Sequence, residues 1–269
     1  MEGITPQDCI QRAKGQISFK VNGSRIEKLY QSGCSKLFLP KTYGEMREAV
    51  MLNTAGGVTG GDMIDVKINA SDCNLAVTSQ TAERFYQSNM HPALISIDLK
   101  IDKQTNFHWL PQETIIFEGA AVDRKITLNM SSDSHCLLAE TLVLGREAMG
   151  ENIQQCHFTD QWRLYCDGKL FHSESIRMIG DVEKLLCSNA SANGARIIST
   201  IICAGPNTEK LKPIVEKNLA SMNSNCAFSF FNKKMIIRLL SLNSASGRAE
   251  LNQMLIALRK QPMPRVWQQ

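Results

Sequence analysis

The residues best placed for chemistry are acidic side chains that stand close to apolar residues: Asp62, Glu83, Glu113 and Glu140. Glu140 is the most enclosed of them, because apolar residues occupy positions 137–139 before it and 142–144 after it. A carboxylate in such a setting must be ion-paired, hydrogen-bonded or in contact with internal water. Carboxylate oxygens are hard ligands, so a set of them along a water-filled passage could exchange a divalent cation rapidly and weakly.

Two other roles for these acids stay open at this point. A pair of carboxylates on a β-helix could cleave a glycosidic bond. Each carboxylate could instead be a surface charge or a structural ion-pair partner, which is the ordinary role of such residues.

The histidines give no sign of a tight metal site. The sequence contains five of them, and no two are spaced as a chelating pair: His91, His108, His135, His157 and His172. His108 precedes Trp109 and could face a cavity together with Glu113. His-rich or Cys/His-rich tracts are absent. We therefore expect no tightly bound metal or other cofactor, and only transient binding of a cation stays open.

A glycine-rich turn at residues 54–62 (TAGGVTGGD) is the most specific local pattern in the chain. Its four glycines allow positive φ angles or the close approach of a neighbouring segment: Gly56, Gly57, Gly60 and Gly61. The turn precedes a strand, because apolar residues alternate with polar ones over 64–69. A phosphate-binding loop needs Gly-Lys-Ser/Thr before a helix, so nucleotide binding is not expected. A Gly-x-Ser-x-Gly nucleophile motif is also missing, and we expect no catalytic centre.

The composition is that of a water-soluble globular protein. With 269 residues, 43% of them hydrophobic, and no Pro/Gly/Ser-rich linker, the chain is expected to form one domain over residues 1–269. The formal net charge of +4 is spread along the chain without a basic block, which disfavours nucleic-acid binding. No apolar run reaches the roughly 20 residues of a membrane span. The polar first 16 residues and nine scattered cysteines without a C-x-x-C pair favour a cytoplasmic location.

Alternating apolar residues predict strands through most of the first 240 residues. Asp167-Gly168 predicts a two-residue hairpin turn. Part of the pattern repeats after about 30 residues, at 66–71 (VKINAS), 97–100 (IDLK) and 126–131 (ITLNMS). Gln80 and Glu140 follow the first and third copies at equal distances. This repeat indicates stacked layers of a β-solenoid-like body, although any chain of alternating strands can produce similar echoes.

Two helices are expected near the C-terminus, after residue 204. The first lies within 209–222 and begins near Pro213, because proline is tolerated in the first turn of a helix and not in its interior. The second follows Ser244, where apolar residues recur with helical spacing between 251 and 258. Pro262 prevents it from continuing.

Five motifs, in order along the chain, carry a resemblance to a known family. They are 52–62 (LNTAGGVTGGD), 78–88 (TSQTAERFYQS), 109–120 (WLPQETIIFEGA), 139–151 (AETLVLGREAMGE) and 264–267 (PRVW). Together they resemble the UreD (UreH) family of urease accessory proteins over nearly the whole chain. Residues 41–46 lack the proline-rich run of many relatives, and Ala55 stands where proline is frequent. These differences concern the stiffness of a loop.

The resemblance implies a mainly β protein with a β-helix-like, stacked-sheet body and few helices. It implies a scaffold-type chaperone, not an enzyme, that is required for nickel insertion during urease maturation. Its partners would be the urease apoprotein, a helical accessory protein (UreF) and a GTPase (UreG) that hydrolyses GTP. An internal route for nickel is associated with the family, and Asp62, Glu83, Glu113 and Glu140 are the candidate residues for it.

Four further residues of the motifs are candidates for an interface or structural role. They are Arg84, Tyr86, Arg146 and Trp267, since aromatic residues and arginine are enriched at protein interfaces. Core packing is the alternative for the aromatic ones.

Two rival interpretations concern the whole chain. One is a β-helix carbohydrate-active hydrolase or lyase with an acid pair, and the other is a β-rich binding module without a role in metal insertion. Turnover by the isolated chain would favour the first, whereas co-purification with urease or its accessory proteins would favour the scaffold.

Overall fold

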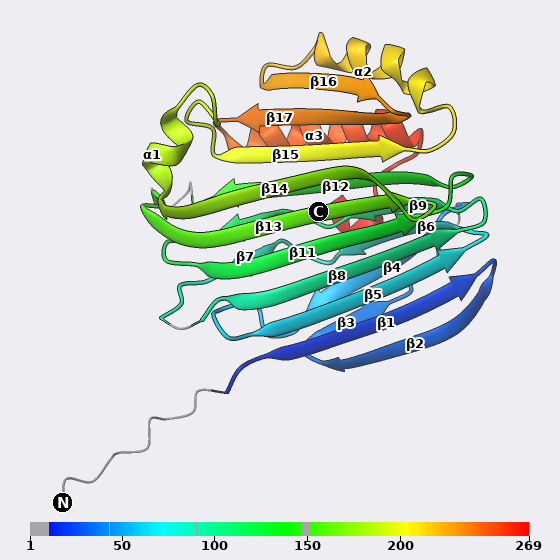
Figure 1. Ribbon diagram of the computed structural model, residues 1–269, viewed down its shortest axis with the longest axis horizontal. Coiled ribbons are helices and arrows are strands. Elements are labelled where there is room, and N and C mark those ends of the chain that lie inside the picture. Colours follow the sequence, from blue (N-terminus) through cyan, green and yellow to red (C-terminus); the bar gives the residue numbers. More distant parts are fainter. Residues whose placement is uncertain (1–10, 43, 90, 147–150, 269) are drawn as a thin grey trace, which may run out of the picture.

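The protein folds into two β-sheets that lie face to face, with helices against one of them (Figure 1). The computed structural model describes residues 11–42, 44–89, 91–146 and 151–268. Sheet A consists, in spatial order, of β14 (Lys169–Asp181), β13 (Gln155–Cys166), β11 (Ala121–Met130), β8 (Ala93–Asp102), β5 (Met63–Ser71), β1 (Lys14–Asn22) and β2 (Arg25–Gly33).

Sheet B lies behind sheet A in Figure 1 and extends beyond it. It consists, in spatial order, of β16 (Asn225–Phe231), β17 (Lys234–Ser241), β15 (Ile197–Ala204), β12 (His135–Leu144), β9 (Asn106–Leu110), β6 (Asn74–Ser79), β4 (Arg47–Asn53) and β3 (Ser35–Phe38). Of two further short strands, β10 (Thr114–Ile116) pairs with β12, and β7 (Glu83–Phe85) pairs with β10.

In the middle of the sequence, successive strands lie alternately in sheet B and in sheet A. Strands β4, β6, β9 and β12 of sheet B alternate along the chain with β5, β8, β11 and β13 of sheet A. Within each sheet these strands pair in parallel. This arrangement is a two-sheet β-helix, in which each layer covers the apolar edge of its neighbour. The expected mainly β, stacked-sheet fold is confirmed.

The register of sheet A shows that the 30-residue repeat is structural. Val66, Ile97 and Ile126 are direct partners on β5, β8 and β11. In sheet B the corresponding row is Val77, Trp109 and Leu138. Glu140 lies two residues after Leu138, whereas Gln80 lies three residues after Val77. The two residues are therefore not at equivalent positions of the repeat, and their predicted alignment was wrong by one position.

Antiparallel strands close both ends of the parallel stack. At one end β2 pairs with β1, and at the other end β14 pairs with β13. Asp167 and Gly168 join β13 to β14 with φ angles of 47° and 76°, as the predicted tight hairpin turn requires. In sheet B the antiparallel strands β15, β17 and β16 continue beyond β12.

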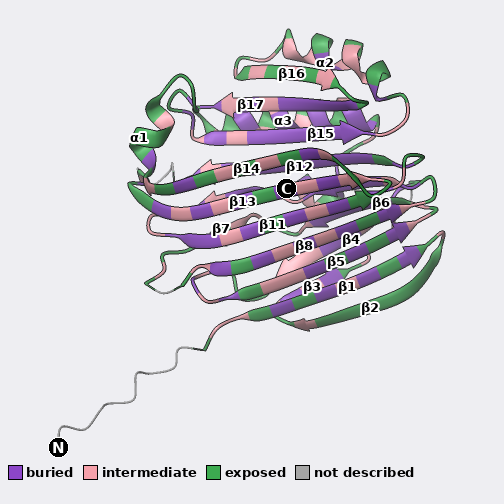
Figure 2. Cartoon of the chain, viewed as in Figure 1, coloured by how far each residue is buried: buried purple, intermediate pink, exposed green. Residues whose placement is uncertain are grey.

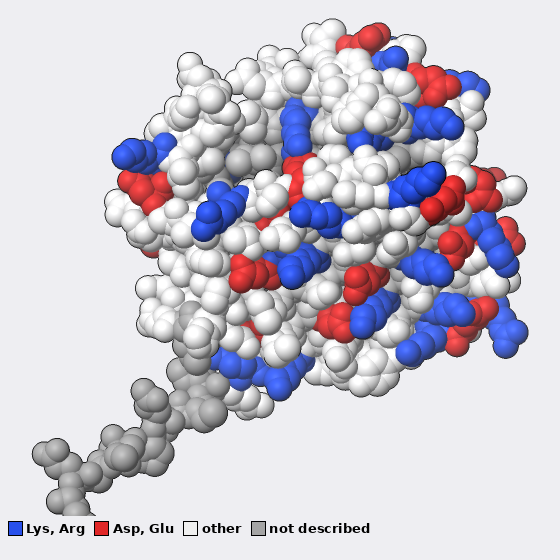
Figure 3. All heavy atoms as spheres, in the orientation of Figure 1, with Lys and Arg blue, Asp and Glu red and all other residues white. Residues whose placement is uncertain are grey.

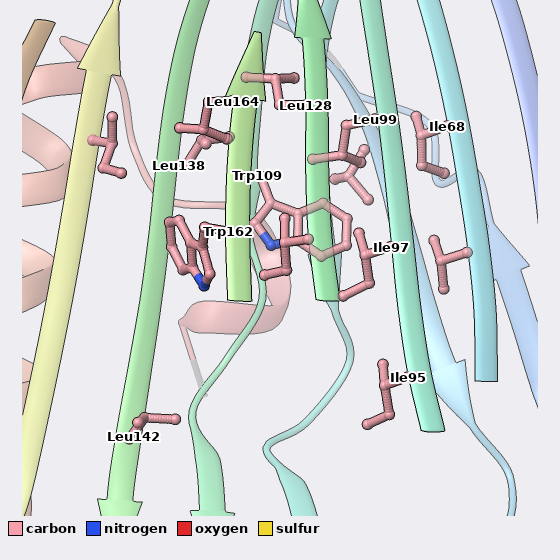
Figure 4. Packing of buried hydrophobic residues seen from close by; sticks show 14 of the residues in the cluster. Ile68, Ile95, Ile97, Leu99, Trp109, Leu128, Leu138, Leu142, Trp162 and Leu164 are labelled. Carbon is pink, nitrogen blue, oxygen red and sulfur yellow. The ribbon is translucent and has the colours of Figure 1, made fainter. Parts of the chain in front are cut away.

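The main core lies between the two sheets. Along the inner strands buried residues alternate with exposed ones, whereas β2 at the edge is exposed along almost its whole length (Figure 2). The largest buried side chains of this core include Trp109 of β9 and Phe158 of β13. In Figure 4 the Trp109 and Trp162 indoles lie among isoleucine and leucine side chains from both sheets. Each layer thus buries its inward face against the opposite sheet.

A second core lies on the outer face of sheet B, under the helices. The longest helix, α3 (Ser244–Arg259), buries Leu251, Met254, Leu255 and Leu258 against the sheet, as its spacing predicts. Its N-cap is Asn243, whose side chain accepts the N–H of Ser246 at 3.0 Å.

The other helices are short. Helix α2 (Lys212–Leu219) follows a 3₁₀ turn, η2 (Thr208–Leu211), and has Pro213 in its first turn as predicted. The sequence did not indicate the six-residue α1 (Val182–Cys187) or the 3₁₀ turn η3 (Arg265–Trp267).

The glycine turn packs tightly against the segment that follows β6. A Cβ atom on Gly57, whose φ is +151°, would lie 2.4 Å from the ring of Tyr86 and 2.7 Å from the carbonyl oxygen of Arg84. A Cβ atom on Gly60 would overlap Ser88. Close approach is therefore the reason for these two glycines, as expected. Gly56 and Gly61 instead have φ angles of +76° and +83°.

The charge distribution agrees with the composition. Basic and acidic side chains are interspersed over the face shown in Figure 3, without a large region of one sign. None of the helices in the described part of the chain is long and apolar enough to cross a membrane.

We expect Gly57→Ala to lower the free energy of unfolding far more than Gly56→Ala does. At Gly56 the new methyl group would meet nothing within 4 Å, so only the left-handed backbone costs about 1–2 kcal/mol. At Gly57 the overlap with Tyr86 adds roughly 1–3 kcal/mol. Urea unfolding of both variants measures the difference, and equal losses would contradict the packing described here.

Candidate functional site

The most distinctive feature of the interior is an arginine that joins the two sheets through two carboxylates. Arg124 of β11 binds Asp160 of β13 with two parallel hydrogen bonds, Nε to Oδ1 at 3.0 Å and Nη2 to Oδ2 at 2.7 Å. From the same guanidinium, Nη1 reaches Glu140 of β12, in the opposite sheet, at 2.8 Å. All three side chains are at least 95% buried. We call Arg124, Glu140 and Asp160 the buried charge cluster.

Two tryptophans complete the hydrogen bonds of the buried charge cluster. The indole N–H of Trp109 donates to Glu140 Oε1 at 2.8 Å, and the indole N–H of Trp162 donates to Asp160 Oδ2 at 2.9 Å. Each carboxylate therefore accepts from the guanidinium and from an indole. A buried ion pair is tolerable only when its remaining lone pairs and protons are satisfied in this way.

Strand alternation places these groups inside. Val122, Ile126 and Leu128 point inward from β11, and Arg124 occupies the inward position between the first two. Asp160 likewise stands between the buried Phe158 and Trp162 on β13. Arg124 and Asp160 are direct partners in the sheet register, so their contact follows from the pairing of the strands.

The electrostatics of the buried charge cluster are set by burial and by its opposite charges. Burial by itself lowers the pKa of Arg124, but the adjacent Asp160 and Glu140 raise it well above its usual range. Burial raises the pKa of Glu140, and Arg124 opposes that shift. The guanidinium is therefore permanently charged, and it holds the cluster together.

A cavity of about 120 Å³ lies between the sheets next to the buried charge cluster. Its walls are largely apolar, with Ile17, Val66, Ile97 and Trp109 among them. Seven polar residues also line it: Asn53, Ser79, Glu83, Gln112, Thr114, Arg124 and Glu140. The exposed Thr81 and Arg84 also line it. The cavity thus extends from the surface near the glycine turn to the buried charge cluster. We call it the inter-sheet cavity.

Glu83 is the acidic residue of the inter-sheet cavity that has no cationic partner within ion-pair distance in the described residues. Its carboxylate oxygens accept from the amide of Asn53 at 3.2 and 3.3 Å, and Oε1 accepts from the backbone N–H of Arg84 at 3.3 Å. Burial raises the pKa of Glu83 to about 7. Near neutral pH this side chain can therefore exchange a proton.

Two other predicted acids lie outside the inter-sheet cavity. Asp62 accepts the backbone N–H groups of Ala13 at 2.8 Å and Thr59 at 2.9 Å, which is the structural role that the sequence left open. Glu113 forms an ion pair with Arg248 of α3 at 3.3 Å in a groove on the outer face of sheet B. The expected shared cavity of His108 and Glu113 was wrong, because His108 lines a different pocket.

The four predicted interface residues occupy different environments. Trp267 is core, because it is buried and its indole N–H donates to Thr78 Oγ1 at 2.9 Å. Tyr86 is 42% exposed and packs on the ring of Phe117. Arg146 stacks over that same ring and pairs with Glu151.

Arg84 is exposed and lines both the inter-sheet cavity and the groove on sheet B. Arg84, Tyr86 and Arg146 thus stay available as contact residues. The segment 147–150, part of a family motif, lies outside the described residues.

Sequence reasoning missed Arg124, Asp160 and Trp162. A signal was present, because Arg124 and Asp160 interrupt the apolar phase of two otherwise alternating strands. In the described ranges no three His, Cys, Asp or Glu side chains are grouped so that they could hold a metal ion. The described residues therefore provide no closed coordination sphere for a metal ion.

We expect Arg124→Met to lower the free energy of unfolding by about 3–5 kcal/mol, because it leaves two buried carboxylates without a counter-charge. The deficit should shrink at acid pH, where Glu140, whose pKa burial raises, becomes protonated. Lys125→Met, at the exposed neighbouring position on β11, is the control and should change stability by about 0.5 kcal/mol at most. Urea unfolding at two pH values tests this, and equal stability of both variants would refute the structural role.

The raised pKa of Glu83 gives stability a defined pH dependence. The folded state binds more protons than the unfolded state between pH 4.5 and about 7, so this residue's contribution is present below pH 4.5 and is lost as pH rises through 7. The loss is on the order of 3 kcal/mol. Glu83→Gln should remove this slope, whereas the exposed Glu209→Gln should keep it. Unfolding curves across this range that match for wild type and Glu83→Gln would contradict the assignment.

Comparisons with known proteins agree with the five motifs. The model of the family described as UreD urease accessory protein matches residues 11–268. The urease accessory protein UreD of Rhizobium leguminosarum bv. viciae is 35% identical over 267 residues, which cover 96% of each chain. Those of Chelativorans sp. (strain BNC1) and Cereibacter sphaeroides (strain ATCC 17025 / ATH 2.4.3) are 35% and 33% identical over 265 and 274 residues. The chain therefore belongs to the UreD family of urease accessory proteins.

Proposed function

We propose that this protein is a non-catalytic scaffold, a chaperone for nickel insertion that acts in a complex during urease maturation in the cytoplasm. Its membership of the UreD family implies a role in urease maturation. The partners in this proposal are the urease apoprotein, a helical accessory protein of the UreF type and a GTPase of the UreG type. Nickel is the cargo of this process and not a resident cofactor.

We further propose that the inter-sheet cavity is part of a route for nickel. The observation that carries this proposal is the placement of Glu83 and Glu140 in the wall of one cavity between the sheets. A transport site must bind weakly enough to release the ion. Glu83 suits such a step, because its carboxylate has only neutral hydrogen-bond partners and exchanges protons near pH 7.

In this proposal the buried charge cluster forms the inner end of the inter-sheet cavity. It does not have the arrangement of a catalytic acid pair. A glycosidase needs one carboxyl that donates a proton and one that is free to attack or to activate water. Glu140 and Asp160 share one guanidinium, and each also accepts an indole hydrogen bond. Neither carboxylate is free for that chemistry, so the hydrolase interpretation has no acid pair at this position.

The test is nickel loading of urease by variants of the scaffold. Glu83→Gln keeps size and hydrogen-bonding capacity but removes the charge that attracts a cation. We expect it to lower the nickel content of the activated urease several-fold while a pull-down recovers the complex unchanged. Asp62→Asn weakens the anchoring of the Ala13 and Thr59 N–H groups, so nickel content and complex yield should fall together. The exposed Glu209→Gln is the control.

Two outcomes would overturn parts of this proposal. Normal nickel content with both Glu83→Gln and Glu140→Gln would exclude the cavity as a nickel route and leave the scaffold. Saturable hydrolysis of a glycoside by the purified chain, lost on Glu140→Gln, would replace the scaffold by an enzyme.

A further inference from the structure

A second pocket, separate from the inter-sheet cavity, lies on the outer face of sheet B where the sheet meets the helices. It has a volume of about 420 Å³. Its floor is formed by side chains from β9, β12 and β15, including His108, Leu137 and Cys203. The 3₁₀ turn η2 and the end of α3 form its rim. Volumes of this size are typical of small-molecule sites.

Several polar side chains that line this pocket have no hydrogen-bond partner within the described residues, although Thr208 and Cys136 do have one. His108 at the floor is 6% exposed, and its Nδ1 is buried without a hydrogen-bond partner. A buried polar atom without a partner is costly and calls for an explanation such as a ligand or water. Five further polar side chains line the pocket without a hydrogen bond or ion pair to the described residues: Asn106, His135, Asn207, Lys210 and Lys260.

The charge of the pocket selects the kind of ligand. Lys210 and Lys260 are exposed at the rim, and neither forms an ion pair with any of the described residues. In the described part of the chain no acidic side chain lines this pocket. Two ammonium groups repel a metal cation, although imidazole and thiol groups lie nearby. The same ammonium groups attract an anion, and the amide and imidazole N–H groups add neutral donors.

We propose that this pocket binds a small oxyanion of the phosphate class. A tetrahedral phosphate presents several acceptor oxygens, which match the many donors around the pocket better than the two oxygens of a carboxylate do. Lysine binds phosphate as a point charge. The pocket has room for the anion together with water molecules that bridge it to the floor. Burial keeps His108 neutral, because it lowers its pKa to about 3, so this ring contributes hydrogen bonding and not charge.

The experiment is calorimetric titration of the full chain at pH 7 with sodium phosphate, compared with sodium chloride at equal ionic strength. We expect saturable binding of one phosphate. Lys210→Gln and Lys260→Gln should each weaken it by about tenfold, since each removes a charged hydrogen bond. Both lysines are exposed, so these variants should fold normally. Lys184→Gln on α1, also exposed and away from the pocket, should bind like wild type.

A second readout places the anion in the pocket. With ¹⁵N-labelled histidine, phosphate should shift the imidazole signals of His108 and His135 and leave that of His91 unchanged. Three results would overturn the proposal: no saturable binding, binding that persists in a Lys210→Gln/Lys260→Gln double variant, or binding of Zn²⁺ instead of phosphate with shifts of the same two imidazoles. The outcome does not depend on whether the inter-sheet cavity carries nickel.

Discussion

The interior of this protein depends on one guanidinium. Arg124 is the charge that allows Glu140 and Asp160 to be buried, and its three donor nitrogens link neighbouring strands of sheet A to the opposite sheet. A β-helix gains stability by adding similar apolar layers, so a layer that contains three ionisable side chains must be held together in another way. The bidentate geometry and the two indole donors provide this, because together they give each carboxylate oxygen a hydrogen-bond donor.

The inter-sheet cavity follows from the same arrangement. Isoleucine, leucine and tryptophan side chains occupy many of the inward positions between the two sheets (Figure 4). Where Arg124 and Glu140 replace apolar side chains, polar groups line the adjoining space, and Asn53 and Glu83 continue this lining toward the surface. The glycine turn matters here because Gly57 lets the segment containing Arg84 and Tyr86 approach closely. Backbone packing at the turn thereby fixes where Glu83 lies.

Much of the fold could be predicted from the sequence, because strand alternation and helical spacing are local signals. The repeat at Val66, Ile97 and Ile126, the hairpin at Asp167-Gly168 and the helix beginning at Ser244 all depend on patterns within a short segment. The site was only partly predictable. Apolar neighbours of Glu140 indicated burial, but nothing local indicates that its partner is Arg124, sixteen residues earlier and in the other sheet. That pairing depends on how the layers stack.

Asp62 and Glu83 also show that the sequence alone does not reveal the role of a carboxylate. Both lie within a family motif and both carry a carboxylate, so nothing in the sequence distinguishes their roles. In the fold, the carboxylate oxygens of Asp62 accept hydrogen bonds from two backbone N–H groups. Glu83 instead lines the inter-sheet cavity, and its hydrogen-bond donors are uncharged. A carboxylate that already anchors the backbone, or that shares a guanidinium as Glu140 does, is a poor stopping point for a cation because its charge is compensated. A carboxylate without a counter-ion is a better one, since its charge is not compensated and metal binding to it depends on losing its proton. The difference between Asp62 and Glu83 in this interior is therefore the partner that the fold supplies to each carboxylate.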